Sequence, residues 1–428
     1  MKILVINCHP DNRGDEAAVH AMVDEISAAY PGVEITLAIR GAGTKYPNMP
    51  SNVKMIHQFI PISSKAKLAH RIAVLTGGRV SISSNEKSLI SEISKADIVL
   101  HGPGGPSIGD TYYSDEPTYL AIYDLLIAMH KPYMFYAPSM GPFQREERNS
   151  WRKKVLEHSE VIVLRDPISE KYVRDFVPDK TISLTLDSAF QHDVNIEQNK
   201  EKLNQYMELK RFLEKHEKCV GVTITDLLWH PVYSKNPAIS KKIHDVFHEF
   251  LSSLTKSGYG VVFIPQLYGN GNDYDLMSTF CCDTNDYFVV TASDERYDTY
   301  FQQYLIGQLY AVIGMRYHSN IFSAKMGTPF ISISYEQKMK GFMEKINLAE
   351  YCIDLKSLST SAVENRFEHL VNHYDEYKKY LCNKHTFMKS EAHKTTDILA
   401  TVLERKEKAI SINDSMYDIN DRKNYTPY

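Results

Sequence analysis

The sequence predicts an α/β fold with two parallel sheets, each covered by helices on both faces. Short apolar runs alternate with longer amphipathic segments along most of the 428 residues, a pattern typical of parallel strands joined by helices. The alternation lapses once, in a strongly charged stretch at 195–218, and then resumes. Because the chain is also too long for one small core, we expect paired Rossmann-like domains that face each other across a cleft.

The strands of the first domain, residues 1–195, are expected at a series of apolar runs. These runs are KILVIN, VEITLAI, DIVLHG, PYMFYAP, VIVLRD and TISLTLD. Near-continuous apolar runs are typical of strands that are buried on both faces of a sheet. The segments between the runs predict helices at 15–30, 115–130, 147–158 and 167–176.

A connecting helix at 196–218 is predicted to lead into the second domain, residues 219–410. The strands of this domain are expected at CVGVTIT, GVVFIPQ, DYFVVTA, LYAVIGM and PFISISY. Residues 361–409 predict C-terminal helices, and residues 411–428 predict a polar tail.

The composition argues against several classes of protein. A net charge of −4 gives no reason to expect nucleic acid as a partner. No run approaches the ~18 apolar residues of a membrane-spanning helix, and MKILVINCHP predicts a first strand and not a signal peptide. The six cysteines show no C-x-x-C spacing, so we expect free thiols and no zinc site. We therefore expect a cytoplasmic protein.

One segment, residues 61–84, interrupts the rhythm of strands and helices. It carries five basic side chains and no acidic one: Lys65, Lys67, His70, Arg71 and Arg79. A basic amphipathic helix of this kind is compatible with peripheral contact with an anionic membrane, here at its inner face, or with a lipid-linked substrate. The composition favours the alternative, a surface insertion with a solvated face.

In open α/β sheets, ligands bind beyond the carboxyl ends of the strands. After the first strand come Asn12 and Asp15, and after DIVLHG comes the loop PGGPSIGD, residues 103–110. Gly104 and Gly105 in that loop let backbone amides approach an anion or a sugar closely, although a plain turn explains the glycines equally well. Asp273, after a later strand, is predicted to recognise sugar hydroxyls.

Arg165 ends an apolar run and is therefore expected to be buried and paired. It either forms a structural clamp with a carboxylate or reaches across the cleft to an anionic ligand. Its place at the carboxyl end of a strand favours the ligand. Asp187 ends the next run and is expected to have a structural role.

The stretch GMRYHSNIFSAKMGTPFISISYEQKMKGF, residues 314–342, places four ionisable side chains at two strand ends. They are Arg316, His318, Glu336 and Lys338. Residues 318–327 predict a short helix with Ser319 or Asn320 as N-cap and Gly327 as its stop. An anion at the helix start would meet backbone amides and Arg316 together. The alternative is a histidine–glutamate hydrogen bond with a solvated lysine.

An ordered set of segments resembles the polysaccharide pyruvyl transferase family. The segments are HPDNRGDEA, HGPGGPSIGD, APSMGPF, LRDPIS, LDSAF and the stretch 314–342, and together they span residues 9–342. Two features depart from the family pattern. The family often has a plain triple glycine where this chain has GPGGPS, and a glutamine before the GPF loop where this chain has Ser139 and Met140.

The resemblance implies a GT-B-like fold, with the acceptor on the first domain and the donor on the second. It implies an enzyme of exopolysaccharide or capsule biosynthesis that uses phosphoenolpyruvate as donor and a glycan or lipid-linked sugar as acceptor. The product would be a pyruvate ketal bridging two hydroxyls, with release of phosphate. His318 resembles the catalytic histidine, Arg165 the arginine that meets the donor, and Lys338 the lysine that completes the site. Arg316 is an additional anion contact, and the scheme needs neither cofactor nor metal.

Two other functions fit parts of the pattern. A GT-B glycosyltransferase with a nucleotide-sugar donor would use similar basic residues, and Glu336 would then bind the ribose. A sugar-binding protein on a degenerate transferase fold would need no catalytic histidine.

Overall fold

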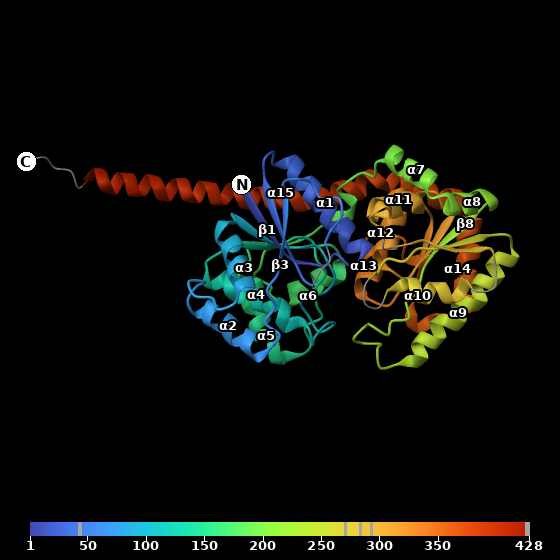
Figure 1. The fold of residues 1–428 in the computed structure, drawn as a ribbon, viewed down its shortest axis with the longest axis horizontal. Coiled ribbons are helices and arrows are strands. Elements are labelled where there is room, and N and C mark those ends of the chain that lie inside the picture. The colour runs from blue at the N-terminus through green and yellow to red at the C-terminus, as the bar shows by residue number, and fades with distance from the viewer. Residues whose placement is uncertain (42–44, 269–271, 282–284, 292–293, 424–428) are drawn as a thin grey trace, which may run out of the picture.

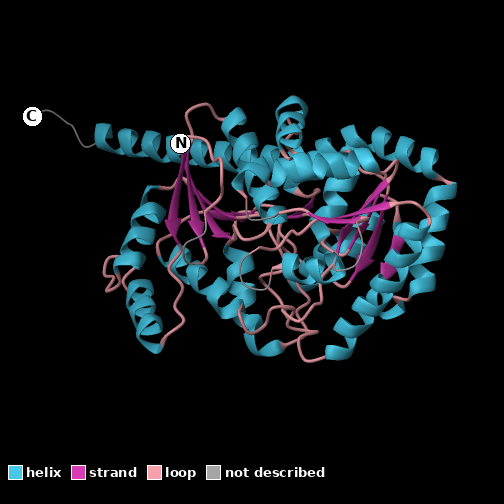
Figure 2. Cartoon of the chain, turned by 45° about the vertical axis from the view of Figure 1, so that its right-hand side comes forward, coloured by secondary structure: helices cyan, strands magenta, loops and turns pink. Residues whose placement is uncertain are grey.

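The computed structural model describes residues 1–41, 45–268, 272–281, 285–291 and 294–423 of the chain (Figure 1). Over these residues the protein forms two parallel sheets, each with helices packed on both faces (Figure 2). This arrangement confirms the predicted α/β fold with two Rossmann-like units. We call the part of the chain through residue 195 the first half and the part from residue 219 onward the second half.

The first sheet has seven strands in the order β3-β2-β1-β4-β5-β6-β7, all in parallel. Its strands are β1 (Lys2–Cys8), β2 (Glu34–Ile39), β3 (Val53–His57), β4 (Ile98–His101), β5 (Tyr133–Phe135), β6 (Ile162–Leu164) and β7 (Ile182–Leu184). Its helices are α1 (Arg13–Ala29), α2 (Ser64–Leu75), α3 (Ser84–Lys95), α4 (Glu116–Ala128), α5 (Asn149–His158) and α6 (Pro167–Phe176). The edge strand β3 was not predicted from the sequence, because it is only half-buried and VKMIH is not a continuous apolar run.

The second sheet has six strands in the order β10-β9-β8-β11-β12-β13. They are β8 (Cys219–Thr223), β9 (Gly260–Phe263), β10 (Tyr287–Val289), β11 (Ala311–Gly314), β12 (Phe330–Ser334) and β13 (Cys352–Asp354). The helices are α9 (Pro237–Lys256), α10 (Asp273–Ser278), α11 (Thr299–Gly307), α12 (Tyr317–Met326), α13 (Gln337–Lys345) and α14 (Thr360–Asn372). In both sheets the strand order reverses once, between β1 and β4 and between β8 and β11, and ligands bind at such reversals.

The connection between the halves is two helices and not the single predicted helix. These are α7 (Ile196–Gln205) and α8 (Met207–Lys215), with Tyr206 between them outside the helical conformation. The Tyr206 ring stacks on Tyr297 with ring centres 4.4 Å apart, and its hydroxyl accepts a hydrogen bond from the Thr291 amide. The helix is therefore interrupted where one aromatic side chain turns inward.

The last helix, α15 (Tyr374–Lys423), runs across both halves (Figure 1). Leu381 and Met388 belong to the core of the second half, and Leu399 and Val402 belong to the core beside β1 and β2. The predicted boundary between domain and polar tail at residue 410 falls within this helix, and residues 424–428 lie outside the described chain. Among the described helices, none is long and apolar enough to cross a membrane.

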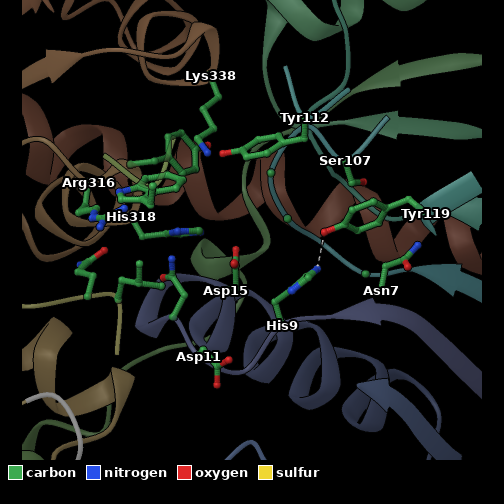
Figure 3. Close-up of a pocket in the computed structure, with 18 of the residues that line it drawn as sticks. Asn7, His9, Asp11, Asp15, Ser107, Tyr112, Tyr119, Arg316, His318 and Lys338 are labelled. Carbon is green, nitrogen blue, oxygen red and sulfur yellow. Dashed lines mark hydrogen bonds between the residues drawn. The ribbon is translucent and has the colours of Figure 1, made fainter. Parts of the chain in front are cut away.

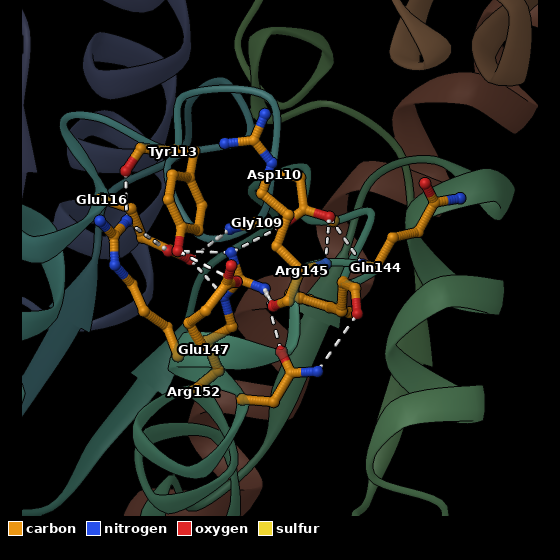
Figure 4. A network of polar contacts seen from close by, with 12 residues as sticks. Gly109, Asp110, Tyr113, Glu116, Gln144, Arg145, Glu147 and Arg152 are labelled. Carbon is orange, nitrogen blue, oxygen red and sulfur yellow. Dashed lines mark hydrogen bonds and ion pairs between the residues drawn. The ribbon is translucent and has the colours of Figure 1, made fainter.

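A buried arginine holds the glycine-rich loop that follows β4 (Figure 4). Arg152 Nε lies 2.7 Å from Glu116 Oε1, and its Nη2 lies 2.8 Å from Asp110 Oδ1. Glu116 also accepts a hydrogen bond from the Gly109 amide at 2.8 Å. Asp110 in turn accepts two backbone amides from the loop after β5. The network therefore fixes the end of the loop 103–110 against its neighbour.

Replacing Arg152 by methionine should remove the closest cation of the buried Glu116 and leave it only the longer contact with Arg148, whose Nη1 lies 3.3 Å from Oε2. We expect the free energy of unfolding in a urea titration to fall by about 3–5 kcal/mol, the scale of a broken buried ion pair. The control is Lys154→Met on the same helix, whose pair with Asp124 is exposed by 46% and 24%. That change should cost less than about 1 kcal/mol. Equal losses for the two variants would contradict the assigned role of Arg152.

Candidate active site

A pocket of about 370 Å³ lies between the two halves, at the carboxyl ends of strands from both sheets (Figure 3). Most of the site residues predicted from the sequence line it, namely Asn12, Asp15, Gly104, Gly105, Arg316, His318 and Lys338. Asp15 points into the pocket from the first turn of α1 (Figure 3). Arg165, Asp273 and Glu336 do not line the pocket, and each lies behind a residue that does.

Helix α12 begins at the pocket. Its N-cap is Arg316, whose side chain does not cap the helix. The predicted N-cap at Ser319 or Asn320 is therefore wrong, because Ser319 Oγ donates to Arg316 O at 2.7 Å within the first turn. The predicted stop at Gly327 is confirmed by its left-handed backbone, with φ of 72°. His318 thus lies in the first turn, where backbone amides lack partners inside the helix and favour an anion.

The imidazole of His318 packs against the first turn of α1, which belongs to the first half. A Cβ atom at Gly14 would lie 2.0 Å from His318 Nδ1 and 2.5 Å from His318 Cβ. Side-chain atoms do not approach this closely, so a residue larger than glycine at position 14 must displace the histidine. The Gly14 amide donates to Asn12 Oδ1 at 2.7 Å, which caps α1.

The loop before α1 pairs with the second half directly. Asn12 forms an antiparallel bridge with Leu267, and the Arg13 amide donates to Gln266 O at 2.9 Å. Backbone pairing of this kind fixes the direction of the chain as well as its position. The first turn of α1 is thereby held against the second half at the pocket.

Asp187 connects Arg165 with His318. Arg165 is fully buried, donates to Asp187 Oδ2 at 2.5 Å, and lies 4.6 Å from the centre of the Tyr317 ring. His318 Nε2 lies 3.6 Å from the same Asp187 oxygen. Burial acts to raise the pKa of Asp187, but Arg165 and then His318 hold it well below its usual range. Arg165 therefore stands behind His318 and not in the pocket, because a buried arginine must be paired with a carboxylate.

A second contact holds the far end of α12 against the first half. Lys325 is buried, and its Nζ donates to Ala189 O at 2.7 Å and to Gln303 Oε1 at 2.8 Å. Burial lowers the pKa of Lys325 to about 7. Ala189 lies in a short 3₁₀ turn that Asp187 caps. The same segment of the first half therefore contacts both the start and the end of α12.

Arg316 faces the pocket with its guanidinium held from behind by Asp273. Its Nε donates to Asp273 Oδ2 at 3.1 Å, and its Nη2 donates to the other carboxylate oxygen. Asp273 also accepts the backbone amides of Gln266 and Leu267, each at 3.0 Å. The guanidinium lies 4.9 Å from the centre of the Trp229 ring. Asp273 was predicted to bind a sugar, but the structure engages its carboxylate in positioning Arg316.

Lys338 enters the pocket beside a buried cluster around Glu336. Its Nζ lies 2.6 Å from Glu336 Oε2. Glu336 Oε1 lies 2.8 Å from His230 Nε2 and accepts from the Tyr112 hydroxyl of the first half at 2.9 Å. Burial acts to raise the pKa of Glu336, but Lys338 and then His230 hold it well below its usual range. The histidine–glutamate hydrogen bond considered for this region is thus made by His230 and not by His318.

The wall that the first half contributes is polar and carries neutral histidines. His9 Nε2 lies 3.0 Å from the Tyr119 hydroxyl, and His101 Nε2 lies 3.2 Å from Ser107 Oγ. Burial lowers the pKa of His9 to about 4 and that of His101 to about 3. Both rings are therefore neutral at neutral pH. Each already contacts hydroxyl groups of the protein, His9 that of Tyr119 and His101 those of Ser107 and Tyr123, so this wall is built of imidazoles and hydroxyls.

Several side chains of the pocket were not predicted from the sequence. A signal for the two histidines existed, because His9 and His101 stand at the carboxyl ends of β1 and β4, where the strand order reverses. Tyr112, Tyr119 and Trp229 gave no comparable signal. They lie in loops or on a helix, and only the tertiary structure brings them to the pocket.

The fold and the pocket define an enzyme built from two Rossmann-like units with its site between them, the GT-B-like arrangement. Residues 12–337 match the family of polysaccharide pyruvyl transferases, and the chain therefore belongs to this family of transferases. It is 20% identical over 415 residues to the amylovoran biosynthesis protein AmsJ of Erwinia amylovora, covering 89% of this chain and 94% of that protein.

Solved structures of low sequence identity share the fold. A UDP-GlcNAc 2-epimerase from Neisseria meningitidis bound to UDP-GlcNAc matches 95% of this chain and 100% of its own, with a TM-score of 0.60 at 12% identity. A UGT transferase from Siraitia grosvenorii in complex with UDP matches 94% of this chain and 100% of its own, with a TM-score of 0.56 at 10% identity. These likenesses establish the architecture.

Gly14→Ala should displace the imidazole of His318. We expect turnover to fall by at least ~100-fold, the scale of a lost general acid–base. The variant should still fold and show a cooperative thermal melting transition, because alanine is favourable in a helix. The comparison is Gly104→Ala, where an added Cβ meets nothing within 4 Å. That change should lower turnover by less than ~10-fold, about one good contact. Full activity in the Gly14 variant would contradict the packing described here.

Lys325 should make stability depend on pH. Its pKa is about 7 in the folded protein and about 10.4 in an unfolded chain. The unfolded state thus binds more protons between these values, and the free energy of unfolding rises with pH there. Lys325→Met should remove a rise of about 2 kcal/mol between about pH 7 and pH 9. Urea titrations of both proteins across this range test it, with exposed Lys171→Met as control. An unchanged slope would contradict the prediction.

Proposed function

We propose that this enzyme transfers the enolpyruvyl group of phosphoenolpyruvate to two hydroxyls of a sugar in a polysaccharide precursor, forming a pyruvate ketal and releasing phosphate. The observation that carries the proposal is the division of the pocket into two unlike walls. The second half supplies Arg316, Lys338 and the start of α12. The first half supplies neutral hydrogen-bonding side chains and the carboxylates of Asp11 and Asp15, which accept hydrogen bonds from hydroxyl groups. A small anionic donor suits the first set and a sugar suits the second.

Phosphoenolpyruvate has a carboxylate and a phosphate, which require several hydrogen-bond donors held in fixed positions. Arg316 and Lys338 supply N–H groups whose directions are set by Asp273 and Glu336. The free amides at the start of α12 add further donors and a favourable dipole. Because each cation is paired with a carboxylate, we assign recognition of the donor to the placement of these N–H groups and not to an excess of positive charge.

The acceptor side is suited to hydroxyl groups. His9, His101, Ser107, Tyr119 and Asn7 line the wall of the first half and offer both donors and acceptors. A pocket of about 370 Å³ is within the range of small-ligand sites, and it accommodates a small donor together with a sugar residue. Membership of the family supports a sugar of a polysaccharide precursor as this acceptor.

The chemistry assigns His318 to proton transfer. One acceptor hydroxyl adds to C2 of the donor while a proton is added to C3, which gives a tetrahedral phospho-ketal. The C2–O bond to phosphate then breaks, and the second hydroxyl adds to C2 and loses its proton. A histidine can take up and return these protons near neutral pH. Asp187, 3.6 Å from Nε2, stabilises the imidazolium form, and Arg316 and Lys338 stabilise charge on the leaving phosphate.

His318→Ala should abolish most turnover while binding remains. In a phosphate-release assay with phosphoenolpyruvate and a panel of free and lipid-linked glycosides, we expect a loss of at least ~100-fold in kcat. The control is His158→Ala on the exposed end of α5, which should change nothing. Turnover of a nucleotide sugar without response to phosphoenolpyruvate would establish the glycosyltransferase reading instead. Undiminished function in the His318 variant would point to a sugar-binding protein.

Lys338→Ala should weaken the donor step, and Lys340→Ala two residues later is its matched control. Lys338 lines the pocket, whereas the Lys340 side chain is 60% exposed and faces Glu344. We expect kcat/KM for phosphoenolpyruvate to fall by ~10–100-fold in the first variant, the scale of a lost charge-assisted hydrogen bond. The second variant should stay within ~2-fold. Similar values for both would rule out Lys338 as a donor contact.

A further inference from the structure

The segment that follows β3 exposes large apolar side chains together with cations. Five apolar residues are strongly exposed there: Ile62 by 71%, Leu68 by 61%, Leu75 by 77%, Val80 by 50% and Ile82 by 66%. The cations Lys65, Lys67, Arg71, Arg79 and Lys87 are also exposed. Soluble proteins seldom gather so many large apolar side chains on one exposed surface unless it binds something. We call these residues the basic-apolar patch.

Helix α2 exposes two leucines and buries two alanines, while Ile72 and Val74 are half-buried. Ala69 and Ala73 are buried, whereas Leu68 and Leu75, seven residues apart, lie on the exposed face with Arg71 between them. A helix that only covers a core would place leucine inward and alanine outward. The inner face is instead fixed by His70, whose ring lies 2.9 Å from Glu86 Oε1 and 2.9 Å from Ala121 O of α4.

The charge of the patch is one-sided. Residues 61–91 contain a single carboxylate, Glu86, which is fully buried against His70 and Ser81. Among the described residues, none of the five exposed cations of the patch forms an ion pair. An exposed apolar stripe flanked by unpaired cations is complementary to an anionic bilayer, whose headgroups meet the cations while the leucines enter the acyl boundary.

The patch is connected to the pocket. It begins beyond the carboxyl end of β3, at the same edge of the first sheet as the pocket, and α2 lies on the opposite side of the first half from α15 (Figure 1). Gln58, which follows β3 and precedes the patch, forms two hydrogen bonds with Asn7 of the pocket wall. Its Oε1 accepts from the Asn7 backbone amide at 2.7 Å, and its Nε2 donates to Asn7 Oδ1 at 2.8 Å. His70 contacts α4, which carries Tyr119 of the same wall.

We propose that the basic-apolar patch docks this protein on an anionic membrane surface, with α2 lying in the headgroup region. The contact places the face of the first half that carries α2 against the lipid. The identities of donor and acceptor do not enter this inference, since adsorption to a bilayer involves neither of them.

The test is co-sedimentation of the whole protein with vesicles, without any substrate. Vesicles of phosphatidylcholine containing phosphatidylglycerol should bind the protein, and vesicles of phosphatidylcholine alone should not. The variants K65Q/K67Q/R71Q and L68S/L75S should each weaken binding by at least ~10-fold, and high salt should reverse it. The controls K171Q/K241Q/K379Q and I196S/M207S, on exposed residues elsewhere, should leave binding unchanged.

Phosphate release with a water-soluble acceptor should be unaltered in the patch variants, which separates this inference from the proposed function. Absence of binding to the anionic vesicles would overturn the inference. Equal binding to both kinds of vesicle, or equal loss in the control variants, would also overturn it. A further result would overturn it: the protein does not bind vesicles, and light scattering shows a dimer that dissociates in the L68S/L75S variant. The patch would then be covered by a second copy of the chain.

Discussion

The position of His318 is set by the half of the protein to which it does not belong. Gly14 of the first half packs against its ring so closely that no Cβ fits, and Asp187 of the first half lies 3.6 Å from its Nε2. Other features follow from this constraint. Asp187 must stay ionised in a buried place, which requires Arg165 beside it. The start of α1 must be fixed against the second half, and the backbone bridge between Asn12 and Leu267 provides this.

Three cations at or just behind the pocket share one feature: each is held by a carboxylate. Arg316 is held by Asp273, Lys338 by Glu336 and Arg165 by Asp187. Burying a cation without a partner would destabilise the fold by more free energy than binding of a ligand could restore. These cations can therefore be buried only when they are paired. The pairing also orients them, since a guanidinium with one edge engaged by both oxygens of a carboxylate, as in Arg316, presents its remaining N–H groups in fixed directions. Selectivity for the proposed anionic donor would therefore rest on geometry, in a pocket whose formal charges are largely balanced.

The sequence predicted the parts of the site that depend on local pattern. Apolar runs revealed every described strand except β3 and β13, which lie at edges of the two sheets. Position after a strand end correctly led to Asn12, Asp15, Arg316, His318 and Lys338 as pocket residues. What it could not supply were contacts between segments far apart in the chain. Arg165 could either bind a ligand or pair with a carboxylate in a structural role. The structure decides this, because the segment after the neighbouring strand β7 places Asp187 Oδ2 2.5 Å from Arg165 Nη1. Glu336 is engaged by His230 and by Tyr112, 106 and 224 residues away.

These contacts make competence for chemistry a property of the assembled pair of halves. Any motion that separates the halves takes Gly14 and Asp187 from His318 and the Tyr112 hydroxyl from Glu336. His318 loses its carboxylate partner, and Glu336, which holds Lys338, loses the Tyr112 hydroxyl, in the same movement. In the proposed reaction the phospho-ketal would be diverted to water in an open site, so a site that is active only when closed would protect the transfer. The interactions that orient His318 are the same ones that hold the halves together, and so orientation and exclusion of water cannot be separated in this protein.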